Sequence, residues 1–319
     1  MEILKTAHAR VNLQTLPPTE QVYTSFVPTR YNGFPVEKYF VSRFDYLTEE
    51  QWAGHIRAGR ITVNGLAVAP GFRIRDRDRI VTRMGFRTEP PADRSLDLLY
   101  EDRHIRVFNK AAPIPVHPSG RYFQNSMTEL LKQVYPNEVP RPVQRLDART
   151  TGVIVFARSR SAASFLMKEF QENRVTKEYL ALVEGRPQSK RFVIDVPIGK
   201  IAGSRRGVGV NVVRPKPAVT EVEWLVSLGD RSLLRVRPRS GRTNQIRVHL
   251  AEWGLPIFND PVYGRENGPE WEFGLHASRL AFKCLDREME IQAVAPYYFQ
   301  SFFNALKKEA HEFPGCQTQ

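Results

Sequence analysis

The sequence has only two cysteines in 319 residues, Cys284 and Cys316. Two thiols cannot build a disulfide framework or a thiolate metal cluster. The seven histidines are scattered, with no His-x-x-x-His pair, so we expect no metal site. No apolar run approaches the roughly 20 residues that a membrane helix needs, and the first residues lack the apolar centre of a signal peptide. These absences favour a protein of the reducing cytoplasm.

Several motifs of nucleotide and hydrolase chemistry are also absent. The sequence contains no Gly-x-x-x-x-Gly-Lys-Ser/Thr loop, no Gly-x-Gly-x-x-Gly after a strand and no Gly-x-Ser-x-Gly elbow. Phosphate-cradling loops, dinucleotide sites and serine hydrolase sites are therefore not indicated, and we expect no cofactor.

Positive charge is abundant. There are 47 Lys and Arg residues against 34 Asp and Glu, which gives a net charge of +13 and a pI near 9.9. A field of this sign attracts polyanions, so nucleic acid is the leading class of partner. The alternative at this stage is a merely basic globular protein, since 41% hydrophobic and 25% charged residues are ordinary values.

The pattern along the chain predicts two domains. Residues 1–32 hold several prolines and little periodicity, which is typical of an extended arm. Residues 33–87 form a compact pattern of two helices and a hairpin, residues 88–95 a linker, and residues 96–319 a larger α/β domain.

The small pattern at 33–87 has clear local signals. Thr48-Glu49-Glu50-Gln51 predicts a capping box, Gly59 a helix end, and Asn64-Gly65 between alternating apolar residues a β-hairpin. From Val41 to Arg87 there are nine arginines and five carboxylates. A solvated surface is the simple interpretation of this charge.

The run Ile-Arg-Ala-Gly-Arg-Ile-Thr-Val-Asn-Gly at 56–65 resembles the alpha-L RNA-binding motif. This resemblance implies a small RNA-binding domain in which Arg57 and Arg60 contact phosphates.

The larger region contains four strand-like runs and two helix-like stretches: 105–108, 153–157, 179–183 and 233–236, then 127–134 and 161–171. The segment 199–217 has several glycines and no carboxylate, so we expect a mobile loop. Its cations Lys200, Arg205 and Arg206 favour phosphate contacts over a merely solvated loop.

One acidic residue stands among arginines just before a strand, in Arg145-Leu146-Asp147-Ala148-Arg149-Thr150-Thr151-Gly152. Spacing alone favours an ordinary Asp–Arg ion pair at a strand edge. The run resembles, however, the Arg-Leu-Asp-x-x-Thr-Ser-Gly motif of the RluA-type pseudouridine synthases. Three more blocks follow the order of that family: Asn109-Lys110 with 115–120, Lys177-Glu178-Tyr179 with the strand after it, and 241–250 with Asp260 and Tyr263-Gly264.

This resemblance implies a fold, an activity and a site. The fold would be an α/β (α+β) pseudouridine synthase domain with a mixed, mainly antiparallel sheet and a central RNA-binding cleft. Asp147 would be the nucleophile, Arg247 the cation that keeps it ionised, and Tyr179 the ring that stacks on a flipped uridine. Arg145 would fill the gap left in the RNA, and Arg242 would contact phosphate. The substrate would be structured ribosomal or transfer RNA, acted on by a monomer without a cofactor.

The sequence departs from the family pattern at several positions, among them Gln144 and Asn244, where histidine is common. These departures concern the positioning of the target loop. Two other classes stay open: a non-catalytic RNA-binding factor on the same scaffold, and a glycosidase that uses Asp147 with a second carboxylate. Whether Asp147 attacks C1′ of the sugar or C6 of the base also stays open.

Overall fold

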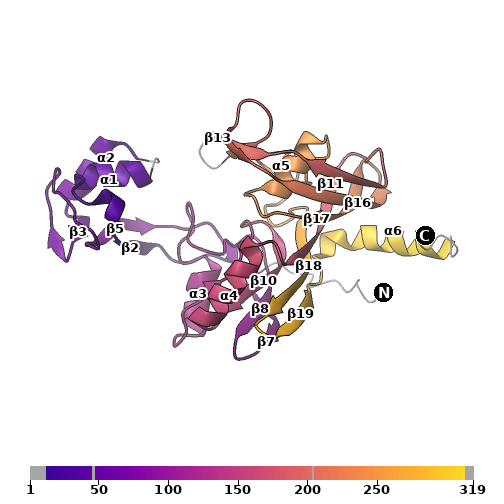
Figure 1. Cartoon of the computed structure of the whole chain (residues 1–319), viewed down its shortest axis with the longest axis horizontal. Helices are drawn as coiled ribbons and strands as arrows, with labels where there is room; N and C mark the ends of the chain where they lie inside the picture. Colours follow the sequence, from indigo (N-terminus) through magenta and orange to yellow (C-terminus); the bar gives the residue numbers. More distant parts are fainter. Residues whose placement is uncertain (1–11, 45–46, 203–204, 313–319) are drawn as a thin grey trace. The chain divides into compact units, whose positions relative to one another are not determined.

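The computed structural model describes residues 12–44, 47–202 and 205–312 of the chain. The chain divides into two compact units, of which the smaller is Leu16–Glu89 and the larger combines Pro90 onwards with the residues up to Thr15. Both are drawn in Figure 1. Within the described residues, none of the helices has the length and apolar character to cross a membrane.

The smaller unit packs two helices on a four-stranded antiparallel sheet. The helices are α1 (Val36–Arg43) and α2 (Glu49–Arg57), and a short 3-10 helix, η1 (Thr29–Tyr31), precedes them. The strand order is β2-β5-β3-β4, with bounds Thr19–Phe26, Arg79–Arg87, Ile61–Val63 and Leu66–Ala67. The rings of Phe40 and Trp52 stack at 4.5 Å in its core, so α1 and α2 bury their aromatic faces against each other.

The local signals of this unit are confirmed. Thr48 and Gln51 form the capping box at the start of α2, and Gly59 has a φ of +68° just after its end. The hairpin turn between β3 and β4 places Asn64 and Gly65 at φ values of +52° and +85°, which a type I′ turn requires.

The structure differs from the sequence analysis at the edges of this unit. β2 lies within the expected arm, yet it pairs along β5 and belongs to the sheet. A second short strand of that arm, β1 (Leu13–Gln14), pairs with β6 (Ala92–Asp93) inside the expected linker. Both pairings join segments more than 50 residues apart, so no local pattern indicates them.

The larger unit is built on a ten-stranded sheet. Its main path is β12-β16-β17-β11-β18-β10-β8-β7, while β19 pairs with β18 and β9 with β10. The pairing of β10 with β18 is parallel and the other pairings are antiparallel, so the expected mixed, mainly antiparallel sheet is confirmed. The strands, in chain order, are Leu96–Glu101 (β7), Ile105–Lys110 (β8), Arg141–Pro142 (β9), Thr151–Ala157 (β10), Thr176–Glu184 (β11), Arg191–Asp195 (β12), Val219–Leu228 (β16), Arg231–Pro238 (β17), Leu275–Cys284 (β18) and Arg287–Gln292 (β19).

Helices cover both faces of this sheet because successive strand residues point to opposite sides. In β10, Val153 and Val155 pack in the core of α4 (Arg160–Gln171), while Ile154 and Phe156 pack in that of α3 (Met127–Val134). Alternate side chains of β11 likewise pack either with α5 (Gln245–Glu252) or with α6 (Gln300–Glu312). A short 3-10 helix, η2 (Tyr297–Phe299), precedes α6. The predicted strands and helices of this unit are confirmed.

The described residues of the segment 199–217 form a small antiparallel sheet, so the expected loop is wrong. Its strands are β13 (Ile198–Ala202), β14 (Arg205–Gly207) and β15 (Val213–Lys216). A Cβ on Gly199 would lie 2.7 Å from that of Val212. Glycine there permits close packing between β13 and the residue before β15.

Candidate active site

Asp147 stands on the loop that leads into β10, and several contacts fix this loop. Leu146 is buried in the core around α3, and the Thr150 amide donates to the Asp147 carbonyl at 3.1 Å. The carbonyl of Ala148 accepts from the Ile114 amide at 3.0 Å. The Asp147 side chain is 29% exposed, so its carboxylate is held in place and still faces solvent.

Gly152 explains why this loop ends at the middle of the sheet. Its φ is +111°, and a Cβ there would lie 2.2 Å from the carbonyl oxygen of Ala277. Only glycine allows β10 and β18 to approach as closely as their parallel pairing requires. The close approach of Gly152 to Ala277 therefore fixes the end of the Asp147 loop next to β18, in the interior of the sheet.

Arg247 on α5 binds two carboxylates at once. Its Nη1 donates to Oδ2 of Asp147 at 2.8 Å, while its Nε and Nη2 donate to Asp260 at 2.7 and 2.8 Å. Burial opposes the charged form, but the hydrogen bonds and charges of Asp260 and Asp147 raise the pKa of Arg247 above its ordinary value. The guanidinium is therefore a permanent cation beside Asp147.

Asp260 is a site residue to which the sequence analysis gave no role. Its side chain is completely buried, and its Oδ1 also accepts from the amides of Val262 and Tyr263 at 2.9 and 3.1 Å. This fork-to-fork pair orients Arg247 and leaves Nη1 for Asp147. The sequence signal was an acidic residue just before the turn Pro-Val-Tyr-Gly. Because Asp260 is enclosed, it does not supply the second accessible carboxylate that a glycosidase needs.

Tyr263 connects this ion pair to the small β13–β15 sheet. Its hydroxyl accepts from the Arg206 amide at 3.0 Å and from Nδ2 of Asn244 at 3.1 Å. Its ring centre lies 5.1 Å from the guanidinium carbon of Arg247, within cation–π range. Asn244, a departure from the family pattern, adopts the left-handed conformation at the start of α5 and accepts from Arg247 at 3.4 Å.

A pocket opens on Asp147 and Arg247. Tyr179 from β11 lines it together with Arg145, Lys177 and the turn Ser240–Asn244. Burial and the charge of Asp147 both raise the pKa of Tyr179 well above its ordinary value, so its phenol stays neutral. A neutral aromatic ring beside a carboxylate and a guanidinium can hold a flat, uncharged base.

Lys110, to which the sequence analysis also gave no role, holds the Asp147 loop through hydrogen bonds to backbone carbonyls. It is 1% exposed, and its ammonium donates to the carbonyls of Ala111, Ile114 and Ala148 at 2.7 to 2.9 Å. Burial lowers the pKa of Lys110 to about 7, although the charges of Asp147 and Asp93 favour its protonated form. All three N–H groups have acceptors, so the side chain ties strand β8 to the Asp147 loop.

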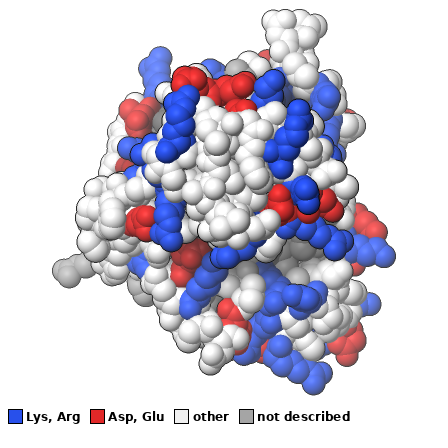
Figure 2. Space-filling model, turned by 90° about the vertical axis from the view of Figure 1, so that its left-hand side faces the viewer, with Lys and Arg blue, Asp and Glu red and all other residues white. Residues whose placement is uncertain are grey.

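The cations proposed for RNA contact lie in several places. Arg145 and Arg242 are exposed at the pocket, and Lys200 and Arg205 are exposed on the β13–β15 sheet, where Arg206 is partly buried. Arg57 and Arg60 are exposed on the smaller unit, where Arg57 pairs with Glu50 at 2.7 Å. Lys and Arg side chains are spread over the face drawn in Figure 2, between smaller groups of Asp and Glu. Of the residues named from the sequence, five line one pocket: Asp147, Tyr179, Arg247, Arg145 and Arg242. The other five cations lie outside its lining.

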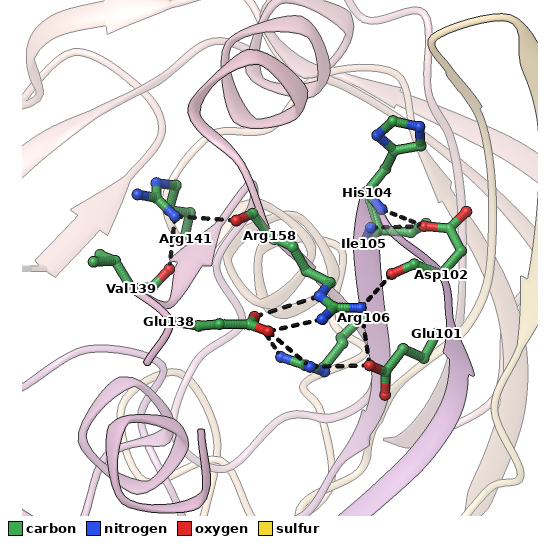
Figure 3. A network of polar contacts seen from close by, with 9 residues as sticks. All are labelled: Glu101, Asp102, His104, Ile105, Arg106, Glu138, Val139, Arg141 and Arg158. Carbon is green, nitrogen blue, oxygen red and sulfur yellow. Dashed lines mark hydrogen bonds and ion pairs between the residues drawn. The ribbon is translucent and has the colours of Figure 1, made fainter. Parts of the chain in front are cut away.

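The far end of β10 carries a second ionic cluster. Arg106 and Arg158 both point toward Glu138, as Figure 3 shows, at 2.7 and 2.8 Å. Glu101 pairs with the same two arginines at 2.9 and 3.0 Å. The hydrogen bonds from Arg158 and Arg106 lower the pKa of Glu138 to about 2. This cluster lies outside the pocket and fixes the chain that follows α3.

Within the described residues, no group of three or more His, Cys, Asp and Glu side chains is arranged to hold a metal ion. Gln144, the other departure from the family pattern, donates from Nε2 to the carbonyl of Val153 at 3.0 Å.

Comparison with known proteins gives a consistent picture. A family model described as RNA pseudouridylate synthase matches residues 104–252. The chain is 31% identical over 261 residues to the mitochondrial tRNA pseudouridine(32) synthase of Saccharomyces cerevisiae, covering 80% of this chain and 55% of the relative. It is 32% identical over 245 residues to ribosomal large subunit pseudouridine synthase D of Pseudomonas aeruginosa, covering 75% and 76% of the two chains.

A solved structure, human RNA pseudouridylate synthase domain containing 1, superposes with a TM-score of 0.57 at 25% identity and covers 72% of this chain and 99% of that one. The chain spans 44 to 63% of the length of three of the curated relatives it matches.

Proposed function

Because the chain belongs to the RNA pseudouridylate synthase family, we propose that it isomerises uridine to pseudouridine in structured RNA, with Asp147 as the nucleophile. The observation that carries this proposal is the contact of Asp147 with Arg247 at 2.8 Å, on the wall of a pocket that Tyr179 also lines. A carboxylate that is anchored, paired with a permanent cation and still accessible is suited to nucleophilic attack.

The reaction breaks the N1–C1′ bond of uridine and joins C5 to C1′. The proton on C5 is released and N1 gains one, so nothing is oxidised or reduced and no cofactor is required. A paired uridine must first leave the helix and enter the pocket. Tyr179 stacks on the flipped base, a contact worth roughly 1–3 kcal/mol. Arg247 donates to the carboxylate of Asp147 and orients it, and this carboxylate attacks either the sugar or the base.

Cations of both units bind the RNA. Arg145, exposed beside the pocket, is placed to occupy the gap that the flipped uridine leaves. Lys200, Arg205 and Arg206 contact phosphates from the β13–β15 sheet. In the smaller unit, Arg57 and Arg60 stand at and just after the end of α2, on exposed positions, and we assign them the same role.

Ribosomal RNA of the large subunit is the first candidate substrate, and transfer RNA is the second. The relatives matched above are named for these two classes of RNA. The two classes share what the site needs, namely a folded RNA whose loop can present one uridine.

Mapping pseudouridines in RNA from cells with and without the gene tests this proposal. We expect one or a few positions to lose pseudouridine without the gene and to regain it when the wild-type chain is restored. Identical maps for the two cell lines would contradict the proposed activity.

A further inference from the structure

We propose that Lys177 and Arg242 form a phosphate-binding site at the mouth of the pocket, which holds a phosphate of the flipped uridine nucleotide. This inference rests on the proposed function and extends it from the base to the backbone of the target nucleotide. Lys177 would thereby act in the recognition of the substrate.

The first support is the alternation of side chains along β11. Lys177 and Tyr179 both line the pocket, whereas Glu178 between them turns away and pairs with Arg237 at 2.7 Å and Arg235 at 3.4 Å. Residues two apart on one face of a strand are separated by about 6.6 Å. The ring of Tyr179 and the ammonium of Lys177 are thus spaced for a base and the phosphate of the same nucleotide.

The second support is that both cations lack an ionic partner. Among the described residues, neither Lys177 nor Arg242 has a carboxylate within 4.0 Å. Lys177 donates to the carbonyl of Ser240 at 3.1 Å, and Arg242 donates from Nε to the carbonyl of Pro217 at 3.0 Å. Lys177 is half-buried and lies within the field of the Arg242 charge, an arrangement that an anion would stabilise. Burial, with the charge of Arg242, accordingly lowers the pKa of Lys177 to about 8.

The third support is the rigidity of the turn that carries Arg242. The buried amide of Gln245 accepts from Oγ of Ser240 at 2.8 Å and from the Arg242 amide at 3.0 Å. The same amide donates to the carbonyl of Val219 and to Oγ1 of Thr220. The turn is therefore fixed before RNA arrives, and its cation does not have to be ordered on binding.

Gly241 lies beside Lys177, since a Cβ at this position would be 3.9 Å from the Lys177 ammonium. The oxygens of a phosphate bound next to this ammonium would accept charge-assisted hydrogen bonds from both cations.

The test compares three small ligands, uridine, uridine 5′-monophosphate and uridine 3′-monophosphate, by NMR titration of the full chain. We expect at least one monophosphate to bind about tenfold more tightly than uridine, since hydrogen bonds to charged groups are stronger than neutral ones. In Lys177→Gln this preference should fall to about twofold or less, and Lys177→Arg should restore it. Lys190→Gln, a change on an exposed lysine outside the pocket, should keep the full preference.

Equal affinities of the wild-type chain for uridine and both monophosphates would overturn the phosphate site. A preference that survives in folded Lys177→Gln would overturn it too, as would the absence of binding of all three ligands at 10 mM. These results are distinguishable from failure of the proposed function. A chain that modifies RNA but shows no Lys177-dependent preference refutes this inference alone, whereas a chain that shows the preference but forms no pseudouridine refutes the proposed activity alone.

Discussion

The two ends of β10 carry the same kind of ionic cluster with different outcomes. At its end, Arg106 and Arg158 face Glu101 and Glu138, so two cations meet two anions. At its start, Arg247 faces Asp147 and Asp260, so one cation serves two anions. The first cluster is balanced in charge. The second holds one carboxylate in the interior and presents the other to a pocket.

The same kinds of chemical group thus form a closed ion-pair cluster in one place and leave a carboxylate open to a pocket in another. In the balanced cluster each carboxylate has two arginines, and nothing in it faces the pocket. In the active-site cluster, Asp260 uses the Nε and Nη2 of Arg247, which leaves Nη1 as the one donor to the Asp147 carboxylate among the described residues. A carboxylate with one strong donor and open space keeps lone pairs free for attack.

The largest effect is expected from Arg247→Met, which removes the one cation of the cluster at the start of β10. We expect the single-turnover rate at pH 6 to fall about a hundredfold, because a charge-assisted contact to Asp147, the proposed nucleophile, is lost. Single-turnover rates at saturating RNA measure this loss.

Arg242→Met is the control for that loss. It should weaken RNA binding and lower the single-turnover rate at saturating RNA much less than Arg247→Met does. The two arginines would be wrongly assigned if Arg242→Met gave the larger loss of rate and Arg247→Met the larger loss of affinity. Because Asp260 becomes unpaired in Arg247→Met, circular dichroism must first show that the variant is folded.

Replacing Leu16–Glu89 by a short Gly-Ser linker tests whether the smaller unit contributes to RNA binding. Gln14 pairs with Ala92, so the linker would close a hairpin between β1 and β6. We expect a folded catalytic unit whose RNA affinity is about tenfold lower and whose log Kd depends less steeply on log salt, since phosphate contacts are lost. Filter binding at several salt concentrations measures both. An unchanged slope would show that Arg57 and Arg60 do not contact RNA.

Tyr263→Phe should give a smaller effect, because it removes the hydroxyl and keeps the ring under Arg247. We expect the rate at saturating RNA to fall about three- to tenfold with an unchanged Kd, the loss that one or two hydrogen bonds produce. Tyr100→Phe, whose hydroxyl binds Asp102 outside the pocket, is the matched control. A loss of the same size in both variants would indicate a general loss of stability.

Glu138→Gln should have the smallest effect, confined to stability. The folded state holds the pKa of Glu138 near 2, below the ordinary value of 4.5. Glu138 therefore stabilises the fold above about pH 4.5, and this contribution is lost as pH falls toward 2. We expect Glu138→Gln to lower the free energy of unfolding at pH 7 by about 1 kcal/mol, because the pair is partly exposed. Urea denaturation at pH 7 and pH 3 should show the difference shrinking at the lower pH.

Much of the local structure could be predicted from the sequence. The Asn64-Gly65 turn, the Thr48 capping box and the helix at 127–134 depend on neighbouring residues, so a local pattern is sufficient. The strand β2 and the β13–β15 sheet depend on partners that only the fold supplies. Both were therefore assigned to irregular chain.

The site divides in the same way. Family resemblance indicated Asp147, Tyr179 and Arg247, which the structure brings to one pocket. The roles of Asp260 and Lys110 could not be predicted, because each depends on burial and on acceptors brought in from elsewhere in the chain. The spacing of Lys177 and Tyr179 acquires meaning only once both are seen to face the same pocket.

The most direct test of the central claim compares Asp147→Asn with Glu138→Gln, the same carboxylate-to-amide change at either end of β10. Purified variants are added to total RNA that carries [5-³H]uridine and comes from cells lacking the gene, and tritium release is followed over time. We expect release at the wild-type rate for Glu138→Gln and none above background for Asp147→Asn, with RNA binding of the latter within about tenfold of wild type. Release by Asp147→Asn at near the wild-type rate would contradict the assignment of Asp147 as the nucleophile.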